Sequence, residues 1–291
     1  MRPRKFAFAA LAATTALVLA ACGDDDDDGA TTEPEEETPT FEAGTTMAEL
    51  SEAGSITVGT KFDQPLFGLV GPDGNPVGFD VEIAKIIASE LGIDEDGIEW
   101  VETVSANREP FIEDGRVDIV AATYTINDER KQVVDFAGPY YVAGQTLMVL
   151  EENTDLTGPD DLAGKTVCSA EGSTPAERIR TEFPETTLVP AAAYSDCLEP
   201  LRNGQVDAVT TDNVILSGFV DQNPGEFKLV DAPTFSEEPY GIGLAKGDDD
   251  FRDFINDVLE ESYEDGRWEE AWVATAGAVL ETPEPPEVDR Y

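Results

Sequence analysis

The sequence of 291 residues contains no histidine, three cysteines, and 18 lysines and arginines against 62 aspartates and glutamates. Without histidine there is no Ser-His-Asp or Cys-His triad, no His-ligated zinc and no imidazole acid–base catalysis. Three cysteines are too few for a zinc cluster or a disulfide scaffold. A formal net charge of −44 argues against nucleic acid as a partner, because phosphate binding needs a basic surface. The 41% of apolar residues is enough for a packed core.

Residues 1–21 are predicted to form a lipoprotein signal peptide. The segment begins with three basic residues, Arg2, Arg4 and Lys5, and continues with an apolar run too short for a bilayer-spanning helix. It is followed directly by Cys22, and Leu19-Ala20-Ala21-Cys22 resembles a bacterial lipobox. We expect Cys22 to carry two or three acyl chains, palmitate among them, because that number anchors a protein stably at the extracytoplasmic face of the cell membrane. The alternative is a plain secretory signal with an unrelated cysteine.

The segment 22–49 is predicted to be a disordered tether that starts at the lipidated cysteine. Residues 23–44 contain ten acidic side chains and no basic one, and such a run repels itself and cannot bury a core. A calcium site at Asp24–Asp28 is a weaker interpretation, because these residues lack the ligand spacing of a calcium loop; we predict no metal site. The remainder, 45–291, is acidic as well, with 52 of the 62 acidic and 15 of the 18 basic residues. A high-salt habitat is one hypothesis for this surface.

From about residue 54, short β-type runs alternate with amphipathic helical stretches. Strands are expected at 55–59, 117–120, 146–150, 166–169, 187–189, 206–209 and 242–245. Helices are expected at 79–91, 127–134, 174–183, 194–201, 213–220 and 250–264. This alternation predicts an α/β fold with mainly parallel strand pairing.

One short pattern occurs twice. Residues 115–120 and 204–209 both read Gly-x-Val-Asp-x-Val, and three residues after each last valine come Thr123 and Asp212. Both positions therefore follow the carboxyl end of a core strand, where open α/β sheets bind ligands. Two such half-sites suggest two lobes that face each other across a cleft. The alternative is a common turn before a strand, with no functional meaning.

Several motifs occur in the order typical of one family: Gly78-Phe79-Asp80, Thr123 to Arg130, Asp135 to Tyr141, and Asp161 to Lys165. Over about residues 50–275 the chain resembles the polar amino acid solute-binding proteins of ABC importers (family 3). Within that family, Lys61-Phe62-Asp63-Gln64-Pro65 resembles the glutamate-binding lipoproteins. The resemblance implies a type II periplasmic-binding-protein-like fold, in which two hinge strands join two α/β lobes and the ligand binds in the interlobe cleft.

This resemblance also sets the expected domain boundaries. Lobe 1 comprises 50–141 and 238–280, lobe 2 comprises 142–237, and 281–291 is an acidic, proline-rich tail. The hinges are expected near 141–146 and 234–240. The family further implies a monomer that delivers a free amino acid to the permease subunits of an importer, with no cofactor and no catalytic residue. The main alternative is an enzyme on the same fold, a dehydratase acting on an amino-acid-like acid.

Four residues are candidates for the main-chain groups of an amino acid. Arg130 is assigned to the α-carboxylate, because a guanidinium makes two parallel charge-assisted bonds to such a group. It is expected in the first turn of a helix, whose free N–H groups also favour anions. Thr123 and Thr125, two residues apart, are expected to add hydroxyl and backbone contacts. Asp212 is assigned to the ammonium.

Two further cations are candidates for specificity. Lys61 follows the first strand, where glutamine-specific relatives typically have an acidic residue, and Arg108 lies at a position where binders of acidic amino acids also hold arginine, in a segment with Ser105. We therefore predict L-glutamate as the ligand, with L-aspartate next and glutamine as the alternative. Lys61 and Arg108 could instead be ordinary surface ion-pair partners.

Two assignments in lobe 2 complete the sequence-based predictions. Ser173 and Thr174, after Gly172, either contact the ligand or simply cap their own helix. Cys168 and Cys197 are predicted to form a disulfide, since an exported protein folds in an oxidising compartment. The alternative is a pair of reduced, buried thiols.

Overall fold

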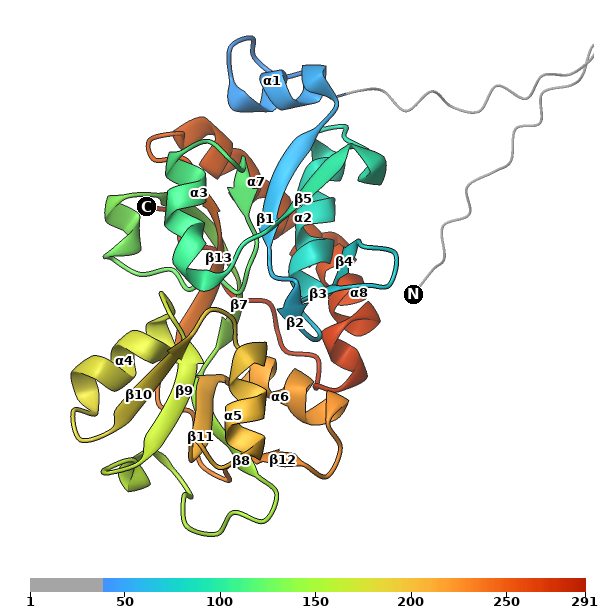
Figure 1. Ribbon diagram of the computed structural model, residues 1–291. Helices are drawn as coiled ribbons and strands as arrows, with labels where there is room; N and C mark the ends of the chain where they lie inside the picture. The colour runs from blue at the N-terminus through green and yellow to red at the C-terminus, as the bar shows by residue number, and fades with distance from the viewer. Residues whose placement is uncertain (1–38) are drawn as a thin grey trace, which may run out of the picture. The chain divides into compact units, whose positions relative to one another are not determined.

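The computed structural model describes residues 39–291. The predicted signal peptide, Cys22 and the tether up to residue 38 therefore lie outside the described residues. Within the described part, no helix is long and apolar enough to cross a membrane. Thr38–Tyr291 forms one compact unit, and it contains two lobes, each built around a five-stranded sheet (Figure 1).

Lobe 1 contains the sheet β5-β1-β6-β13-β7. Its strands, in that order, are Ile98–Glu102, Ile56–Thr60, Ile119–Val120, Glu238–Leu244 and Asp135–Ala143. The pairs β5–β1 and β1–β6 are parallel, whereas β13 is antiparallel to both β6 and β7. The lobe's helices are α1 (Thr46–Ala53), α2 (Phe79–Glu90), α3 (Arg108–Glu113), α7 (Asp249–Asp265) and α8 (Arg267–Ala274). A small antiparallel sheet is formed by β2 (Asp63–Gln64), β3 (Gly68–Val70) and β4 (Pro76–Val77).

Lobe 2 repeats this plan with the sheet β10-β9-β11-β8-β12. Its strands, in that order, are Thr187–Ala191, Thr166–Ala170, Ala208–Asp212, Gln145–Leu150 and Phe227–Leu229. Again two pairs are parallel and two antiparallel. The helices are α4 (Thr174–Glu182), α5 (Leu198–Arg202) and α6 (Asn213–Gln222). The expectation of mainly parallel pairing is therefore only half right, because β7, β8, β12 and β13 run against their neighbours.

The chain crosses between the lobes twice. It leaves the lobe 1 sheet at Ala143 and enters the lobe 2 sheet at Gln145, and it returns along β13 (Figure 1). The two crossing strands pair with each other, with Tyr141 opposite Tyr240. Gly144 links β7 to β8 and lies close to Thr234. A Cβ at this position would lie 2.6 Å from the Thr234 side chain, so a larger residue would clash there. The two hinge strands thus form a continuous ribbon behind the cleft.

The repeated sequence pattern corresponds to a repeated structure. Gly115 and Gly204 both have a φ of +64°, a conformation that favours glycine. After each of them an aspartate accepts a hydrogen bond from a backbone N–H of the adjacent strand: Asp118 from Thr57 and Asp207 from Thr166, both at 2.7 Å. Each pattern therefore joins the third parallel strand of a lobe to its neighbour, and this supports the two-lobe interpretation.

Two local expectations differ from the structure. The segment 127–134 is not a regular helix: it contains a single 3₁₀ turn, Arg130–Gln132, because the chain enters β7 already at Asp135; the Asn127 side chain caps this turn by accepting from the Arg130 N–H at 2.9 Å. The end of the predicted tether is also folded, since α1 begins at Thr46 and Phe41 packs edge-on against Phe254 with ring centroids 5.5 Å apart. Apolar anchors at Phe41 and Leu50, which is buried, fix this segment to the lobe.

Candidate functional site

Lys61 comes directly after β1 and points into the protein. Only 3% of its surface is exposed, and its Nζ donates to Ser105 Oγ at 2.8 Å. Burial, helped by the nearby charge of Arg108, lowers the pKa of Lys61 to about 7. This hydrogen bond uses one of the three protons of the Lys61 ammonium, so two remain for a ligand.

Arg108 begins α3 and is buried as deeply, with 2% of its surface exposed. Its Nε donates to the Ser105 carbonyl, Nη1 to the carbonyls of Ala122 and Thr123, and Nη2 to the Gly172 carbonyl in lobe 2, all at 3.2–3.3 Å. Within residues 39–291 neither Lys61 nor Arg108 forms an ion pair, so the alternative of ordinary surface ion pairs is wrong.

Arg130 is held by the 3₁₀ turn rather than by a helix, so no helix N-terminus adds to its attraction for anions. Its Nη1 donates to the Thr125 carbonyl at 2.7 Å, its Nη2 to the Gly172 carbonyl at 3.0 Å, and its Nε pairs with Glu109 at 3.1 Å. Both Arg130 and Arg108 lie over the ring of Tyr124, at 4.9 and 4.3 Å from its centroid. The two guanidinium groups therefore share one aromatic support and reach one carbonyl of the opposite lobe.

Thr123 connects these cations to two residues that sequence reasoning missed, Asp80 and Gln64. Its φ of +44° is unusual for a threonine, and it is held by a hydrogen bond from its N–H to Asp80 at 2.8 Å. Tyr140 donates to the other Asp80 oxygen at 2.6 Å, while burial raises the pKa of Asp80 to about 7. The Thr123 hydroxyl donates to Gln64 Oε1 at 3.0 Å. Each of them lies in a family motif, Asp80 in Gly78-Phe79-Asp80 and Gln64 in the segment Lys61 to Pro65, but neither motif by itself assigned the residue to the site.

The facing wall from lobe 2 starts at Gly172, whose carbonyl accepts from both arginines. A Cβ at Gly172 would lie 2.7 Å from the Ala106 backbone, and its φ is +77°, so only glycine permits this close approach of the lobes. Ser173 caps α4, because its Oγ accepts from the Ala176 N–H at 3.1 Å. The hydroxyl of Thr174 lies 3.2 Å from that of Thr125 in lobe 1.

Asp212 ends β11 and precedes α6. One carboxylate oxygen accepts from the Tyr240 hydroxyl at 2.6 Å, while the other, Oδ1, is buried and has no hydrogen-bond partner in the described part of the chain. Burial, together with the nearby Glu238, raises the pKa of Asp212 to about 7. A buried carboxylate oxygen without a donor is a costly arrangement, and an ammonium group would satisfy it.

The predicted ligand-binding residues therefore all lie at the junction of the two lobes, though not all in the expected role. Three basic side chains are buried there: Lys61, Arg108 and Arg130. The hydroxyl groups of Ser173 and Thr174 form hydrogen bonds with other protein groups. A cavity of about 730 Å³ opens beside these residues: Arg130, Ser173 and Thr174 are among its lining residues, whereas Lys61, Arg108 and Asp212 lie deeper and do not line it. The buried cations and Asp212 together offer partners for more than one carboxylate and one ammonium.

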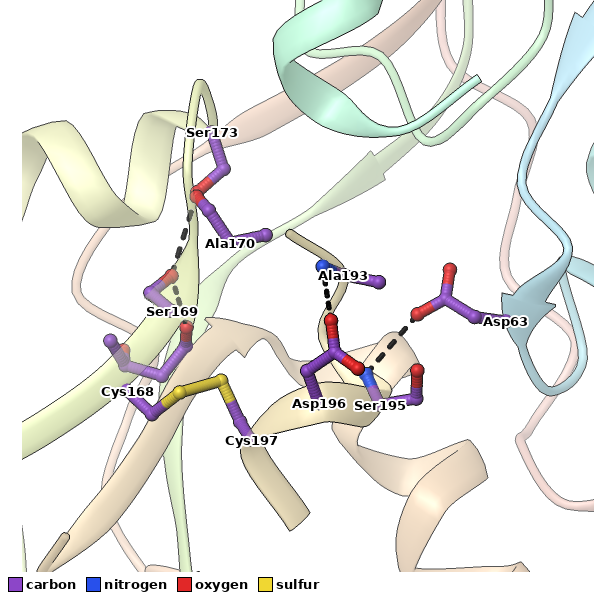
Figure 2. Close-up of a disulfide and its surroundings, with 10 residues drawn as sticks. Asp63, Cys168, Ser169, Ala170, Ser173, Ala193, Ser195, Asp196 and Cys197 are labelled. Atoms are coloured by element: carbon purple, nitrogen blue, oxygen red, sulfur yellow. Dashed lines mark hydrogen bonds between the residues drawn. A yellow bond between two sulfur atoms is a disulfide. The ribbon is translucent and has the colours of Figure 1, made fainter. Parts of the chain in front are cut away.

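The predicted disulfide is confirmed: Cys168 of β9 is bonded to Cys197 (Figure 2). Cys197 ends the 3₁₀ turn Ser195–Cys197, and the Ser195 N–H donates to Asp63 of lobe 1 at 3.1 Å. The disulfide thus fixes a turn that also takes part in a contact between the lobes.

Comparison with known proteins agrees with this geometry. The family model of bacterial extracellular solute-binding proteins, family 3, matches residues 56–272. The glutamate-binding protein GluB of Corynebacterium glutamicum is 43% identical over 227 residues, 75% of this chain and 77% of the relative. The ABC transporter glutamine-binding protein GlnH of Bacillus subtilis is 37% identical over 229 residues, 78% of this chain and 83% of the relative. Among solved structures, an ancestral arginine-binding protein bound to glutamine has a TM-score of 0.72 at 36% identity and covers 76% of this chain and 97% of that one.

These relatives are binding proteins and not enzymes, which confirms the prediction of a non-catalytic role. The likeness to solved binding proteins also confirms the type II fold with two lobes. The chain belongs to the bacterial extracellular solute-binding proteins, family 3.

Proposed function

We propose that the protein captures an acidic amino acid outside the cell, L-glutamate most readily and L-aspartate next, and delivers it to the permease of an ABC importer. One observation carries the proposal: a solute-binding protein buries three basic side chains, Lys61, Arg108 and Arg130, and also Asp212, whose Oδ1 lacks a donor among the described residues. An acidic amino acid has the two carboxylates and the ammonium that this set requires.

The ligand groups are assigned as follows. The α-carboxylate binds Arg130, whose Nη1 and Nη2 each carry a second N–H besides those donated to Thr125 and Gly172. The ammonium donates to Asp212 Oδ1, and the side-chain carboxylate takes the spare donors of Lys61, with Arg108 close by. Each charged group of the ligand then has a partner once water is removed.

Glutamine is the principal competitor, since similar proteins are named for glutamate and for glutamine. The two ligands differ only at the end of the side chain, where a carboxylate accepts hydrogen bonds and an amide also donates. The donors of Lys61 and Arg108 cannot accept from an amide N–H. Charge and hydrogen-bond polarity therefore both favour glutamate at this position.

Delivery follows from closure of the lobes. Contacts that both lobes make only when they are together supply the differential affinity that drives a hinge motion, and the permease recognises the closed form. We place the protein at the extracytoplasmic face of the cell membrane, anchored through acylated Cys22 and working as a monomer.

Calorimetric titration against the twenty amino acids tests the proposal. Lys61→Met is expected to weaken glutamate binding about 10- to 100-fold, the value of a hydrogen bond between charged groups, and to change glutamine binding much less. Asp212→Asn is expected to abolish binding of both. Lys85→Met is the matched control, because Lys85 forms surface ion pairs with Glu82 and Glu95. If glutamate binding survives Lys61→Met unchanged, the assignment of specificity is wrong.

A further inference from the structure

The lobes contact each other at a second place, through residues that none of the ligand assignments uses. Asp63 begins β2 in lobe 1, and one of its carboxylate oxygens accepts from the backbone N–H of Ser195 in lobe 2 at 3.1 Å (Figure 2). Neither Asp63 nor Ser195 lines the cavity beside Gly172. This carboxylate therefore binds the opposite lobe without belonging to the predicted set of ligand-binding residues.

The turn that Asp63 contacts is held in place by lobe 2. Ser195 begins a 3₁₀ turn that ends at Cys197, whose disulfide to β9 is buried. Within the turn, the Asp196 side chain accepts from the Ala193 N–H at 3.1 Å (Figure 2). The first N–H groups of a helical turn have no partner inside it, so that of Ser195 is available to the other lobe. The turn therefore presents a free donor at a fixed position.

Two residues further along lobe 1, the backbone packs directly on α6 of lobe 2. A Cβ at Gly218 would lie 2.7 Å from the Pro65 carbonyl oxygen and 3.1 Å from the Pro65 Cβ. The first of these distances is too short for a real Cβ, so an alanine at this position would push the lobes apart. Asp63 and Pro65 thus meet lobe 2 at two points, one a hydrogen bond and the other a tight backbone contact.

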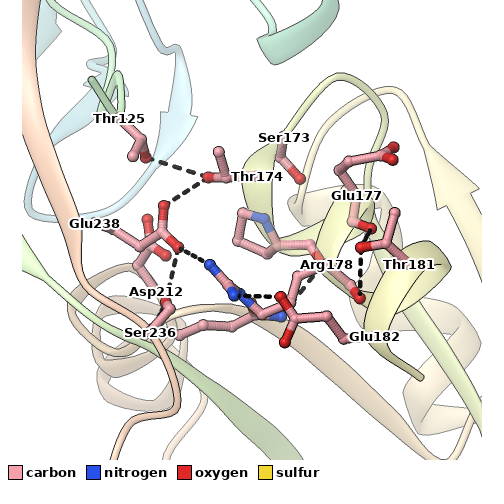
Figure 3. A network of polar contacts seen from close by, with 12 residues as sticks. Thr125, Ser173, Thr174, Glu177, Arg178, Thr181, Glu182, Asp212, Ser236 and Glu238 are labelled. Atoms are coloured by element: carbon pink, nitrogen blue, oxygen red, sulfur yellow. Dashed lines mark hydrogen bonds and ion pairs between the residues drawn. The ribbon is translucent and has the colours of Figure 1, made fainter. Parts of the chain in front are cut away.

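The lobes are therefore held together on both sides of the hinge strands. On one side, among the predicted ligand-binding residues, the hydroxyls of Thr125 and Thr174 lie 3.2 Å apart (Figure 3). On the other side, β2 meets α6 and the turn before α5 (Figure 1). The bond between Asp63 and Ser195 joins the lobes directly, so it exists only while they are together. A contact present only in the closed state stabilises that state and slows release of an enclosed ligand.

We propose that Asp63 is a positioning residue for lobe closure: its carboxylate binds the disulfide-fixed turn of lobe 2 and, with Pro65 packed on Gly218, holds the lobes closed. This inference rests on the proposed function in one respect, since closure serves capture of a ligand between the lobes. The charge of Asp63 also acts on Lys61, whose pKa it raises. Loss of the charge and loss of the acceptor are therefore tested separately.

Two substitutions of Asp63 make this separation. Asp63→Ala removes the acceptor together with the charge, and it is expected to raise Kd for glutamate about tenfold, mainly through faster dissociation. Asp63→Asn removes the charge but keeps an oxygen that accepts from Ser195, so its Kd should stay within about threefold of the wild type. Asp73→Ala is the matched control, because Asp73 is exposed in the neighbouring hairpin and, among the described residues, accepts only from Asn75.

Gly218→Ala tests the tight backbone contact without any change of charge. The added methyl group meets the Pro65 carbonyl only when the lobes are closed, so Kd is expected to rise about tenfold for glutamate and for aspartate alike. Alanine is favoured over glycine inside a helix, so the melting temperature of the ligand-free variant should not fall, as it would after general damage to the fold. Ser217→Ala is the control, because this hydroxyl donates within α6, to the Asn213 carbonyl at 2.8 Å, and its Kd should equal that of the wild type.

Hydrogen exchange of the Ser195 amide, followed by NMR, supplies a readout that needs no ligand. The amide is expected to exchange slowly in the wild type and in Asp63→Asn, and faster in Asp63→Ala. If the wild type binds no amino acid, the proposed function fails, and this exchange alone decides whether Asp63 holds the turn.

If the wild type binds, three results would overturn the inference. Unchanged Kd in Asp63→Ala would show that the contact does not contribute to closure. An equal loss of affinity in Asp63→Ala and Asp63→Asn would assign the effect to the charge near Lys61 instead. Unchanged Kd in Gly218→Ala would show that the lobes need not approach this closely to hold the ligand.

Discussion

Burial acts in opposite directions on the two titratable groups that the proposed ligand contacts. It lowers the pKa of Lys61 to about 7, where Arg108 adds to the effect and Asp63 and Asp80 oppose it, and it raises the pKa of Asp212 to about 7. A bound carboxylate favours the charged form of Lys61, and a bound ammonium favours the charged form of Asp212. Binding of glutamate should therefore move both pKa values back toward their ordinary ranges.

The affinity for glutamate is accordingly expected to be highest near pH 7. Above pH 7 the free protein loses the Lys61 proton that the complex keeps, so affinity falls as pH rises, at most tenfold per pH unit. Below pH 7 the free protein binds a proton at Asp212 that the complex must release, so affinity falls as pH falls. Calorimetric titrations between about pH 5.5 and 8.5, in two buffers of different ionisation enthalpy, measure both effects.

Glutamine supplies the internal control for this pH dependence. It carries the ammonium but no side-chain charge, so it should show the acidic decline and lack the alkaline one. Lys61→Met should remove the alkaline decline for glutamate as well. An alkaline decline that persists in Lys61→Met would show that another group, such as Asp80, controls it.

Sequence reasoning found the cations of the site more readily than its carboxylates. Bases are scarce in this chain, 18 against 62 acids, so Lys61, Arg108 and Arg130 stood out wherever a motif contained them. Asp80 and Glu238 are two acids among many, and nothing local shows that either is buried. Their hydrogen bonds with Thr123 and Thr174, respectively, form only in the tertiary fold.

Among the secondary-structure elements, the longest helices could be predicted and the connecting segments could not. α2 and α7 have regular apolar periodicity, and their observed bounds are close to the predicted ones. The predicted helix 127–134 is reduced to one turn because β7 begins at Asp135 and pairs with β13, a long-range constraint that periodicity does not register. Short edge strands such as β12 form through long-range pairing, here with β8, and have no local sequence pattern from which they could be predicted.

The C-terminal tail is an element with an observed structural role. Tyr291 accepts from the Phe136 N–H at 2.9 Å, and the Asp289 N–H donates to Gly138 at 2.8 Å, so the tail covers the edge strand β7. Tyr291→Phe should lower the free energy of unfolding by about 1 kcal/mol through loss of the hydroxyl. Tyr291→Ala should lower it by about 2 kcal/mol, because Lys131, 3.7 Å above the ring, also loses its partner.

Denaturant unfolding of both variants measures these differences. The phenylalanine variant serves as the control for the ring, since it keeps the contact between the ring and Lys131 and removes only the hydroxyl. Equal stability of Tyr291→Ala and the wild type would mean that the tail does not hold the strand in solution.

The disulfide gives a second prediction at this scale. It closes a loop with a sequence separation of 29 in lobe 2, for which the chain-entropy model gives about 3.5 kcal/mol. Replacing Cys168 and Cys197 together by alanine should lower Tm by about 10 °C, the shift expected for that free energy in a unit of this size. Calorimetric unfolding with and without reductant checks this: reductant should destabilise the wild type and leave the double variant unchanged.

For the molecule as a whole, the two-lobe plan could be predicted from three independent signals. Alternating strands and helices indicated the class, the repeated Gly-x-Val-Asp-x-Val pattern indicated two similar halves, and the family motifs supplied the hinges. The direction of the strands could not be predicted fully, because β8 and β13 owe their antiparallel pairing to the two crossings between lobes. No local pattern encodes which sheet a strand joins after a crossing.

The charge of the whole molecule leads to the last prediction. Residues 45–291 carry 52 acidic and 15 basic side chains, so mutual repulsion opposes the compact state. Surface ion pairs such as Lys85–Glu82 and Arg202–Glu199 compensate only a small part of this repulsion, because each contributes less than about 1 kcal/mol. Raising NaCl from about 0.01 M to 1 M shortens the Debye length from about 30 Å to about 3 Å and should therefore raise Tm at pH 7.

A second titration at a pH near the sequence pI of about 4.1 separates screening from other effects of salt. Near that pH the carboxylates are largely protonated and the net charge approaches zero, so screening has little repulsion to relieve and the rise in Tm should nearly vanish. An equal rise at both pH values would assign the effect to salt exclusion from the protein surface instead. No rise at pH 7 would contradict both the repulsion argument and the hypothesis of adaptation to high salt, because an acidic surface gains from salt only through the charges that it holds apart.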